Sequence, residues 1–509
     1  MLFSPRWPTR SGPTGPARRP TPRRGLRRAL GGLGVLGAAG VLGAVSLSLP
    51  LTPIGAAGAP APAPAIAWAP CPTTPGYRCG ALRVPLDYGH PTHGAVALAV
   101  MEHVAPHGRG VVVFNPGGPG ESGVSILPLE VSWIPAAVRD HLTLVSFDER
   151  GTGASDPLLC GPSAAAAASA TAGTPSGTRV FAGLARACRS AYPALFPTVT
   201  TTTSARDMDR LRQALGVDRI DYYGTSYGSV LGTVYRQLFP AHVRSMVLDG
   251  AVDSNLSLTV DADLEAPAIQ AALDHDLTAC SAAPGCPLGA DPVGFYRSLQ
   301  HRLAQAPLPA PGGGDTTPVT EGDLDSATLL YLSVPALTPG FLPALVSAAA
   351  GDGAPLRSVA LTLETDLDGK SLVGPLWTIQ CSDAVAHPNG ATTAALARSL
   401  DARYPLGGAE AVANNLIGCP GWAGSGGPVA PIEPVKAPTA LVIGNTGDPN
   451  TPYASARLLA SAIRGRLVTY IAYSHSWLLN GNTDACMQAV VGSYLAAGTL
   501  PAAGTRCGP

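Results

Sequence analysis

The residue types with the clearest chemical potential form a Gly-x-Ser-x-Gly frame around Ser226. An apolar, strand-like segment ends at Tyr223, and an apolar, helix-like segment begins after Gly228. In such a frame the serine sits on a sharp strand-to-helix turn that exposes its hydroxyl, and the glycines stand where a Cβ would clash. The frame therefore predicts a nucleophilic serine. Because the chain contains 60 glycines, the five residues alone are equally compatible with an ordinary turn.

A nucleophilic serine needs a histidine base and a carboxylate that orients the base. Two later segments provide them in the chain order Ser, Asp, His. Asp448 follows the strand-like run 440–443, and His475 follows the last such run, 467–471. The alternatives are a turn aspartate and a surface-loop histidine, but the joint order favours a catalytic triad. Thr451 either hydrogen-bonds the Asp448 carboxylate or caps the following helix.

Hydrolysis by a serine also requires N–H groups that stabilise the oxyanion. The first expected donor is the backbone N–H of Tyr227, directly after the nucleophile. The second is expected from the Gly-rich loop 115–120, with Gly118 preferred over Gly117, because glycines let the backbone approach the reacting oxygen. The alternative for this loop is a plain Gly/Pro turn.

The elements that must position these residues are short, unbroken apolar runs alternating with amphipathic stretches such as 204–215. This alternation of strand-like and helix-like segments predicts an α/β protein with a mostly parallel sheet, helices on both faces and a ligand site at the carboxyl ends of the strands. Residues 80–105 read as a further pair of strands. The apolar runs are 110–114, 142–147, 219–223, 244–249, 440–443 and 467–471.

The character of the chain changes between residues 251 and 434, where short helical patterns and Pro/Gly-rich loops replace the strands. We therefore predict an inserted, mainly helical cap over the carboxyl edge of the sheet. It divides a core made of residues 68–250 and 435–509. The Ala-rich stretch 163–177 is predicted to be a low-complexity surface loop.

Residues 1–67 are predicted to be an export segment and a Pro/Ala-rich linker. A basic region without acids is followed by an apolar run, 29–49, and by small-residue sites, which is the order of a secretory signal. Arg23 and Arg24 also resemble a twin-arginine signal. An uncleaved anchor is the alternative, since the apolar run is just long enough to span a bilayer. We expect cleavage, location outside the cell or at its envelope, and no stable membrane association afterwards.

Composition limits the other classes of function. A net charge of −1 with 13% charged residues provides no electrostatic basis for binding nucleic acid. The ten cysteines include no Cys-x-x-Cys, so we predict no metal site and no cofactor.

The cysteines are expected to form disulfides in an exported chain, with free buried thiols as the alternative. Sequence leaves the connectivity open, but pairing of sequence neighbours closes short loops and is the expected pattern. The expected pairs are Cys71 with Cys79, Cys160 with Cys188, Cys280 with Cys286, Cys381 with Cys419, and Cys486 with Cys507.

Several stretches together resemble the secreted tripeptidyl-aminopeptidase-like branch of the α/β-hydrolases, which are relatives of the proline iminopeptidases. The resemblance implies an α/β-hydrolase fold with the triad Ser226, Asp448 and His475, supported by Thr451. The chain departs from the family at Glu121, where a small residue is more usual, and in the residues flanking the histidine. The matching stretches are CGALRVPLDYGHP (79–91), NPGGPGESG (115–123), FDERGTGASDPLLC (147–160), YYGTSYGSVLGTVYRQLFPAHVRSMVLDGAVD (222–253), GNTGDPNTP (444–452) and the tail 474–507.

The resemblance also implies that the chain is an aminopeptidase, whose substrate carries a free α-ammonium group. A carboxylate is the natural partner of that group. The candidates are Glu121, Asp383 and Glu149. The expected function is a secreted serine exopeptidase that releases short peptides from free N-termini through an acyl-enzyme. The alternatives are a secreted esterase or lipase with the same triad, and a catalytically inactive binding protein of the same fold.

Overall fold

The computed structural model describes residues 65–311, 316–335, 339–367, 369–422, 427–481 and 484–508. Residues Pro62–Pro509 form one compact unit. The predicted export segment lies almost wholly outside the described residues, so its nature stays a prediction.

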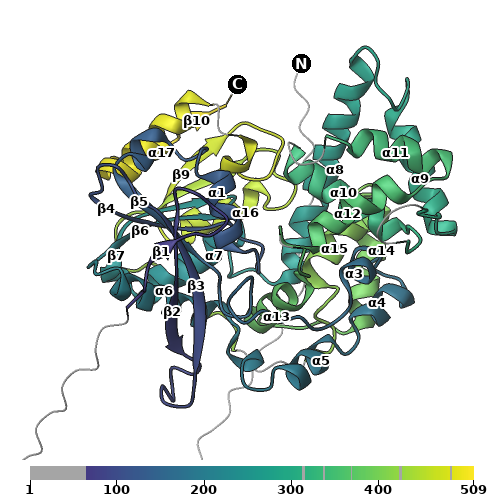
Figure 1. The fold of residues 1–509 in the computed structure, drawn as a ribbon. Coiled ribbons are helices and arrows are strands. Elements are labelled where there is room, and N and C mark those ends of the chain that lie inside the picture. The colour runs from purple at the N-terminus through teal and green to yellow at the C-terminus, as the bar shows by residue number, and fades with distance from the viewer. Residues whose placement is uncertain are drawn as a thin grey trace, which may run out of the picture. The chain divides into compact units, whose positions relative to one another are not determined.

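A ten-stranded sheet forms the centre of this unit, in the order β1-β2-β3-β5-β4-β6-β7-β8-β9-β10 (Figure 1). The neighbours from β1 to β5 pair antiparallel, and all the later neighbours, from β5 to β10, pair parallel. The predicted mostly parallel sheet is therefore confirmed. The strands are β1 Ala69–Pro70, β2 Arg78–Pro85, β3 Ala95–His103, β4 Gly110–Asn115, β5 Leu142–Phe147, β6 Ile220–Thr225, β7 Val243–Asp249, β8 Leu441–Asn445, β9 Arg466–Tyr470 and β10 Arg506–Cys507.

Helices cover both faces of the sheet, because the central strands are apolar on both sides. Along β4, Val113 belongs to one buried cluster, whereas its neighbours Val112 and Phe114 belong to the other. The first cluster includes residues of α6, α7 and α16, and the second includes residues of α1, α2 and α17. These helices are α1 Gly123–Glu130, α2 Ala136–Arg139, α6 Thr201–Ala214, α7 Tyr227–Leu238, α16 Tyr453–Ala462 and α17 Ala485–Ala497.

A run of helices lies between β7 and β8, at the place predicted for the cap (Figure 1). The described part of this insertion is mainly helical, as expected. Its predicted limits at residues 251 and 434 stay predictions, because core and insertion form one compact unit. The helices are α8 Leu258–Ala282, α9 Pro292–Gln305, α10 Glu321–Ser333, α11 Phe341–Ala350, α12 Ala354–Glu364, α13 Val373–Asp383, α14 Gly390–Arg403 and α15 Gly408–Leu416.

The prediction of a surface loop over 163–177 is wrong. This stretch contains α3, Ala164–Ala168, and enters α4, Pro175–Phe181; α5, Leu184–Ala191, follows. Ala167 and Ala168 are buried, and Ser169 accepts a hydrogen bond from the buried Arg357 of α12. Alanine is the best helix former, and its small side chain lets helices approach closely. The repetitive composition therefore marks a packed helix that extends the layer built by the insertion.

The ten cysteines form five disulfides between sequence neighbours, and all five pairs are those expected from the spacing. Such bonds fit an oxidising compartment. The alternative of free buried thiols is therefore wrong for this structure. The bonds join Cys71 to Cys79, Cys160 to Cys188, Cys280 to Cys286, Cys381 to Cys419, and Cys486 to Cys507.

No helix within the described residues combines the length and hydropathy that a membrane span requires.

Candidate active site

Ser226 lies on a strained turn between β6 and α7. Its backbone has φ 57° and ψ −125°, a region that non-glycine residues adopt only where the surrounding structure enforces it. A Cβ on Gly224 would lie 2.3 Å from the carbonyl oxygen of Gly228, and one on Gly228 would lie 2.7 Å from that of Asn115. The two glycines of the frame are therefore required by close backbone approach, and the turn presents the serine at the carboxyl edge of the sheet.

The Gly-rich loop after β4 lies against this turn. A Cβ on Gly117 would stand 2.6 Å from the carbonyl oxygen of Thr225 and 2.9 Å from Cβ of Ser226. The N–H of Gly117 donates to Asn115 Oδ1 at 3.1 Å, which makes Gly118 the better placed oxyanion donor of the two. Gly118 lines one cavity together with Ser226 and Tyr227. Tyr227 is the first residue of α7, where backbone N–H groups have no partner within the helix.

Asp448 and His475 meet on the loops that follow β8 and β9. The ring Nδ1 of His475 lies 3.0 and 3.1 Å from the two carboxylate oxygens of Asp448. Since a carboxylate only accepts, Nδ1 carries the hydrogen and Nε2 is left as the basic nitrogen. Thr451 donates to Asp448 Oδ2 through its hydroxyl at 3.0 Å and to Oδ1 through its N–H at 2.8 Å. Of its two predicted roles, Thr451 therefore has the one that supports the carboxylate.

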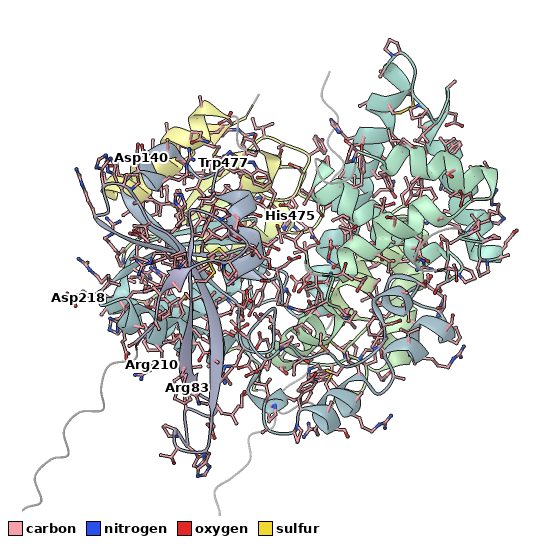
Figure 2. All side chains as sticks on the ribbon, viewed as in Figure 1. Arg83, Asp140, Arg210, Asp218, His475 and Trp477 are labelled. Atoms are coloured by element: carbon pink, nitrogen blue, oxygen red, sulfur yellow. A yellow bond between two sulfur atoms is a disulfide. The ribbon has the colours of Figure 1, made fainter. Side chains whose placement is uncertain are left out.

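Buried polar groups hold the histidine loop from three directions. Asn445, at the end of β8, donates to the carbonyl oxygens of Ser474 and Ser476. Asp249, at the end of β7, accepts the N–H groups of Trp477 and Leu478 at 2.9 Å. The N–H of His475 itself donates to the carbonyl oxygen of Ser333 in the insertion. Figure 2 shows His475 on the side of the core that faces the insertion.

Asp249 also links the histidine loop to the nucleophile turn. Its carbonyl oxygen accepts the N–H of Ser226 at 2.8 Å. The next residue, Gly250, has φ +59°, and a Cβ there would lie 3.1 Å from Cε1 of His475. The serine turn and the imidazole are therefore packed around a position that only glycine fits without displacing the ring.

The electrostatics around His475 favour its protonated form. Burial alone lowers the pKa of the imidazole, but the charge and hydrogen bond of Asp448, together with the charge of Asp249, outweigh burial and raise the pKa above its ordinary value of 6.5. A base must be neutral to accept the serine proton, so reactivity should rise as the pH passes through this raised pKa.

We therefore expect the rate of Ser226 labelling by a fluorophosphonate, measured from about pH 5 to about pH 9, to have an acidic midpoint above the ordinary histidine value of about 6.5. This probe needs no knowledge of the substrate and has no amine of its own to titrate. A midpoint at or below that ordinary value would contradict the raised pKa of His475.

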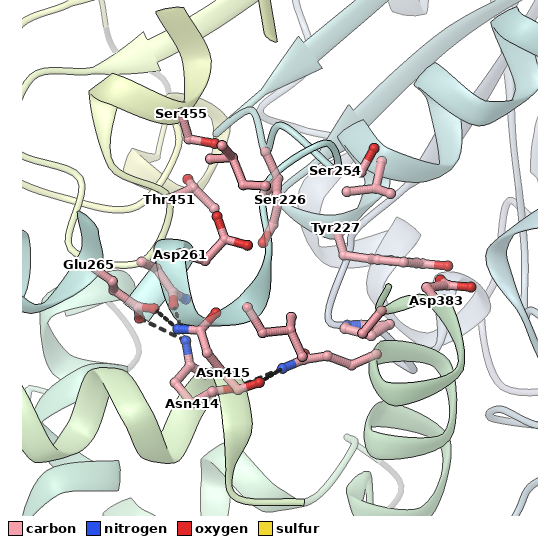
Figure 3. Close-up of a pocket in the computed structure, with 18 of the residues that line it drawn as sticks. Ser226, Tyr227, Ser254, Asp261, Glu265, Asp383, Asn414, Asn415, Thr451 and Ser455 are labelled. Atoms are coloured by element: carbon pink, nitrogen blue, oxygen red, sulfur yellow. Dashed lines mark hydrogen bonds between the residues drawn. The ribbon is translucent and has the colours of Figure 1, made fainter. Parts of the chain in front are cut away.

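A cavity of about 190 Å³ opens at Ser226 between the core and the insertion. Much of its wall is apolar, and a few polar groups converge on it, as is usual for ligand sites. Figure 3 shows Ser226 with Asp261 and Glu265 on one side and Tyr227 and Asp383 on the other. The apolar wall includes Val230, Val252, Leu256, Leu258, Leu264, Leu376, Val385 and Val429.

The three predicted ammonium partners differ in their relation to this cavity. Asp383, the last residue of α13, lines it. Glu149 is buried and lies within hydrogen-bond distance of the Tyr227 hydroxyl. Glu121 is not among the lining residues; burial and the charge of Asp366 raise its pKa to about 7.

Two carboxylates missed by sequence reasoning also line the cavity. Asp261 and Glu265 are four residues apart on α8, a spacing that places both on one helix face. This spacing is readable from the sequence, but nothing in the sequence says that the face meets Ser226. Glu265 accepts hydrogen bonds from the amides of Asn414, at 2.7 Å, and Asn415 (Figure 3). Burial raises the pKa of Glu265 well above its usual range. The two amides oppose this rise, and the charge of Asp261 adds to it.

One group of potential metal ligands occurs among the described residues, formed by Asp484, Cys486 and Cys507. Its two sulfurs are joined in a disulfide, so they offer no thiolate to a metal ion.

A mostly parallel sheet with a serine on a strand-to-helix elbow, and with an aspartate and a histidine on later carboxyl-end loops, is the arrangement of one class of serine hydrolase. The chain belongs to the alpha/beta hydrolase fold family, whose model matches residues 110–481.

Three curated relatives cover most of the chain. Serine protease Hip1 of Mycobacterium tuberculosis is 30% identical over 88% of this chain and 92% of its own length. Carboxylesterase B of the same organism is 32% identical over 85% and 86%. Tripeptidyl aminopeptidase of Streptomyces lividans is 29% identical over 85% and 84%. The predicted family resemblance is confirmed, and the chain is an enzyme, a serine hydrolase of the α/β-hydrolase family with relatives named as peptidases.

Proposed function

We propose that this protein is a secreted serine exopeptidase that removes short peptides from free N-termini. Ser226 is its nucleophile, His475 its general base and Asp448 the carboxylate that orients the base. The N–H groups of Tyr227 and Gly118 form the oxyanion hole. Secretion is supported by the signal-like order of residues 1–67 and by the five disulfides.

The single observation that carries the exopeptidase proposal is the acidic side of the cavity. Asp261 and Glu265 share it with Ser226, and the hydrogen bonds to Glu265 described above come from neutral amides. Glu265 is buried and Asp261 is half-buried, and two such neighbouring carboxylates repel each other and are costly to ionise without a cation. The α-ammonium of a peptide supplies that cation, and its position would place a nearby peptide bond at Ser226. The predicted candidate Asp383 lies on the other side of the nucleophile in Figure 3.

The mechanism follows from the roles of these groups. Ser226 Oγ attacks the scissile carbonyl carbon while His475 Nε2 takes the hydroxyl proton. The tetrahedral oxyanion receives hydrogen bonds from the two backbone N–H groups. When the C–N bond breaks, the imidazolium protonates the departing amine and an acyl-enzyme remains. Water, deprotonated by the same histidine, then releases the short peptide and restores the serine.

Free-amine dependence tests this proposal directly. We expect a tripeptidyl anilide with a free N-terminus to be cleaved, and its N-acetylated counterpart to be cleaved at least about 10-fold less well, because acetylation removes a charge-assisted hydrogen bond. Equal kcat/KM for the two substrates would overturn the exopeptidase proposal while leaving the serine hydrolase class intact.

Glu265→Gln tests the partner of the ammonium group. The variant keeps the side-chain volume and removes the carboxylate, so kcat/KM for the free-amine substrate should fall about 10- to 100-fold. The acetylated substrate should lose little, which separates lost recognition from damage to the triad. Glu433→Gln, an exposed carboxyl on the chain surface, is the matched control and should behave as wild type. A parallel loss for both substrates would argue against amine binding at Glu265.

Esterase activity is the second candidate function. It is favoured by the apolar wall of the cavity and by the relative named carboxylesterase B. A panel of p-nitrophenyl esters beside the peptidyl anilides separates the two. Turnover of esters alone would establish the esterase.

A further inference from the structure

A chain of side-chain contacts runs behind the nucleophile turn, from the insertion to the core. Asp383 Oδ2 contacts Thr201 Oγ1 in a short hydrogen bond. Thr201 Oγ1 lies 2.5 Å from the Tyr227 hydroxyl, and that hydroxyl lies 3.3 Å from Glu149 Oε2. The carboxyl groups of Glu149 and Asp383 are therefore connected through two hydroxyls, although the two residues are far apart in the sequence.

The Glu149 end and the middle of this series of contacts are attached to elements of the active site, and the Asp383 end is anchored to the first residue of α6. Glu149 Oε1 accepts from Asn115 Nδ2 at 3.1 Å, and Asn115 Oδ1 accepts the N–H of Gly117 at 3.1 Å. The middle of the chain is the side chain of Tyr227, whose own backbone begins α7 next to the nucleophile. At the other end, Asp383 Oδ1 accepts the N–H of Thr201 at 3.2 Å. The contacts thus support both sides of the proposed oxyanion hole.

The number of available hydrogens decides whether all the contacts between Asp383 and Glu149 can be hydrogen bonds. Three contacts join four oxygen atoms, and each hydrogen bond needs one hydrogen. The hydroxyls of Thr201 and Tyr227 supply one each, and an ionised carboxylate supplies none. With both carboxyls ionised, one contact would bring two oxygens together without a hydrogen between them. One proton on either carboxyl completes the set, and it can reside at either end if both hydroxyls reverse direction.

We propose that Glu149 and Asp383 hold one proton between them, and that this shared proton completes the hydrogen-bond chain that positions the nucleophile turn and the oxyanion loop. Both residues act through other groups and are positioning residues. The proposal rests on the proposed function in one respect, that Ser226 is the nucleophile whose surroundings are positioned.

Burial and the charges around Glu149 and Asp383 both favour retention of one proton by the pair. Burial raises the pKa of Glu149 to about 7 against the opposing effects of the Asn115, Ser204 and Tyr227 side chains, and the charge of Asp207 raises it further. Burial likewise raises the pKa of Asp383 to about 7 against its bonds from Thr201, with Glu149 adding to the rise. Asp207 is paired with Arg150, and the neighbouring hydroxyls of Tyr222 and Tyr227 have pKa values well above 10, mainly through burial.

Amide substitutions test whether a shared proton is needed, because the NH₂ group of an amide donates a hydrogen bond without carrying a titratable proton. In Glu149→Gln the carbonyl can still accept from Asn115 while the NH₂ donates to Tyr227 Oη. In Asp383→Asn the carbonyl can still accept the N–H of Thr201 while the NH₂ donates to Thr201 Oγ1. Either single variant therefore has three hydrogens for three contacts while its remaining carboxyl is ionised, so it needs no carboxyl proton to complete the set. The double variant has four, so one hydrogen is left without an acceptor.

The first readout is the rate of fluorophosphonate labelling at pH 6 and pH 8. We expect each single variant to label within about threefold of wild type at pH 6, and the ratio of variant to wild type to rise at pH 8, where the wild type loses its shared proton. The double variant should label about 10-fold more slowly than either single variant at both pH values, because a buried donor is left unsatisfied. Glu364→Gln removes another carboxyl whose pKa is raised by burial, outside the chain of contacts, and its ratio should not change with pH.

The second readout is thermal unfolding in the Ser226→Ala background, which is independent of catalysis. A carboxyl with a raised pKa binds its proton more tightly in the folded state, so the wild-type free energy of unfolding falls as the pH rises between the unfolded pKa of about 4 and about 7. The single variants lack this fall, so their Tm relative to the parent should rise from pH 5 to pH 8.

Two results would overturn the shared proton. One is a pH-independent Tm difference between each single variant and its parent. The other is a double variant that labels no worse than the singles, which would mean independent structural roles. Absence of peptidase activity, with the stability pattern intact, would overturn the proposed function alone.

Discussion

Ser226→Ala is expected to lower turnover of every cleaved substrate by a factor on the order of 10⁶ and to abolish fluorophosphonate labelling. The strained turn exposes the Ser226 hydroxyl. Alanine lacks this oxygen, so His475 and Asp448 have no nucleophile to activate. The fold should survive, because the substitution removes one oxygen and leaves the backbone bond from the N–H of Ser226 to Asp249 in place.

The measurement is steady-state turnover with mass analysis of the labelled protein. Ser176→Ala, at an exposed serine of α4, is the matched control and should label like wild type. Labelling that persists in the Ser226 variant, at a site mapped to another serine, would remove Ser226 from the mechanism.

Asp448→Asn should lower kcat by about 10⁴ with little change in KM. The carboxylate accepts from the His475 ring, from the Thr451 hydroxyl and from the N–H groups of Asn450, Thr451 and Ser476. An amide cannot accept from all of these groups, and it no longer selects the tautomer with hydrogen on Nδ1. The lost charge also removes the main cause of the raised pKa of His475, so the acidic midpoint of labelling should move to lower pH.

Thr451→Val separates the orienting role from general packing. It removes one of the several hydrogen bonds to Asp448 and keeps the charge, so we expect a loss of about 10-fold and an unchanged direction of the His475 pKa shift. Thermal unfolding of both variants controls for folding. An Asp448→Asn enzyme within tenfold of wild type would show that another group orients the base.

The order of the site residues was predictable because parallel strands deliver their carboxyl ends to one edge of a sheet. Once the runs before Ser226, Asp448 and His475 are recognised as strands, chain order alone indicates that the loops meet. Composition was a poorer guide than strand order for residues 163–177. Their repetitive composition suggested a loop, whereas the buried partner Arg357, nearly two hundred residues later, makes them a packed helix.

By itself, the sequence determined the elbow, the strands that carry the loops and the family. These depend on short-range rules, such as the glycines that allow close backbone approach and the apolar runs that favour buried strands. Only the tertiary structure decided which carboxyls share a site. Asp261 and Glu265 face the nucleophile, and Glu149 reaches Asp383 through Thr201 and Tyr227, because the packing of the insertion brings together side chains that no local pattern connects.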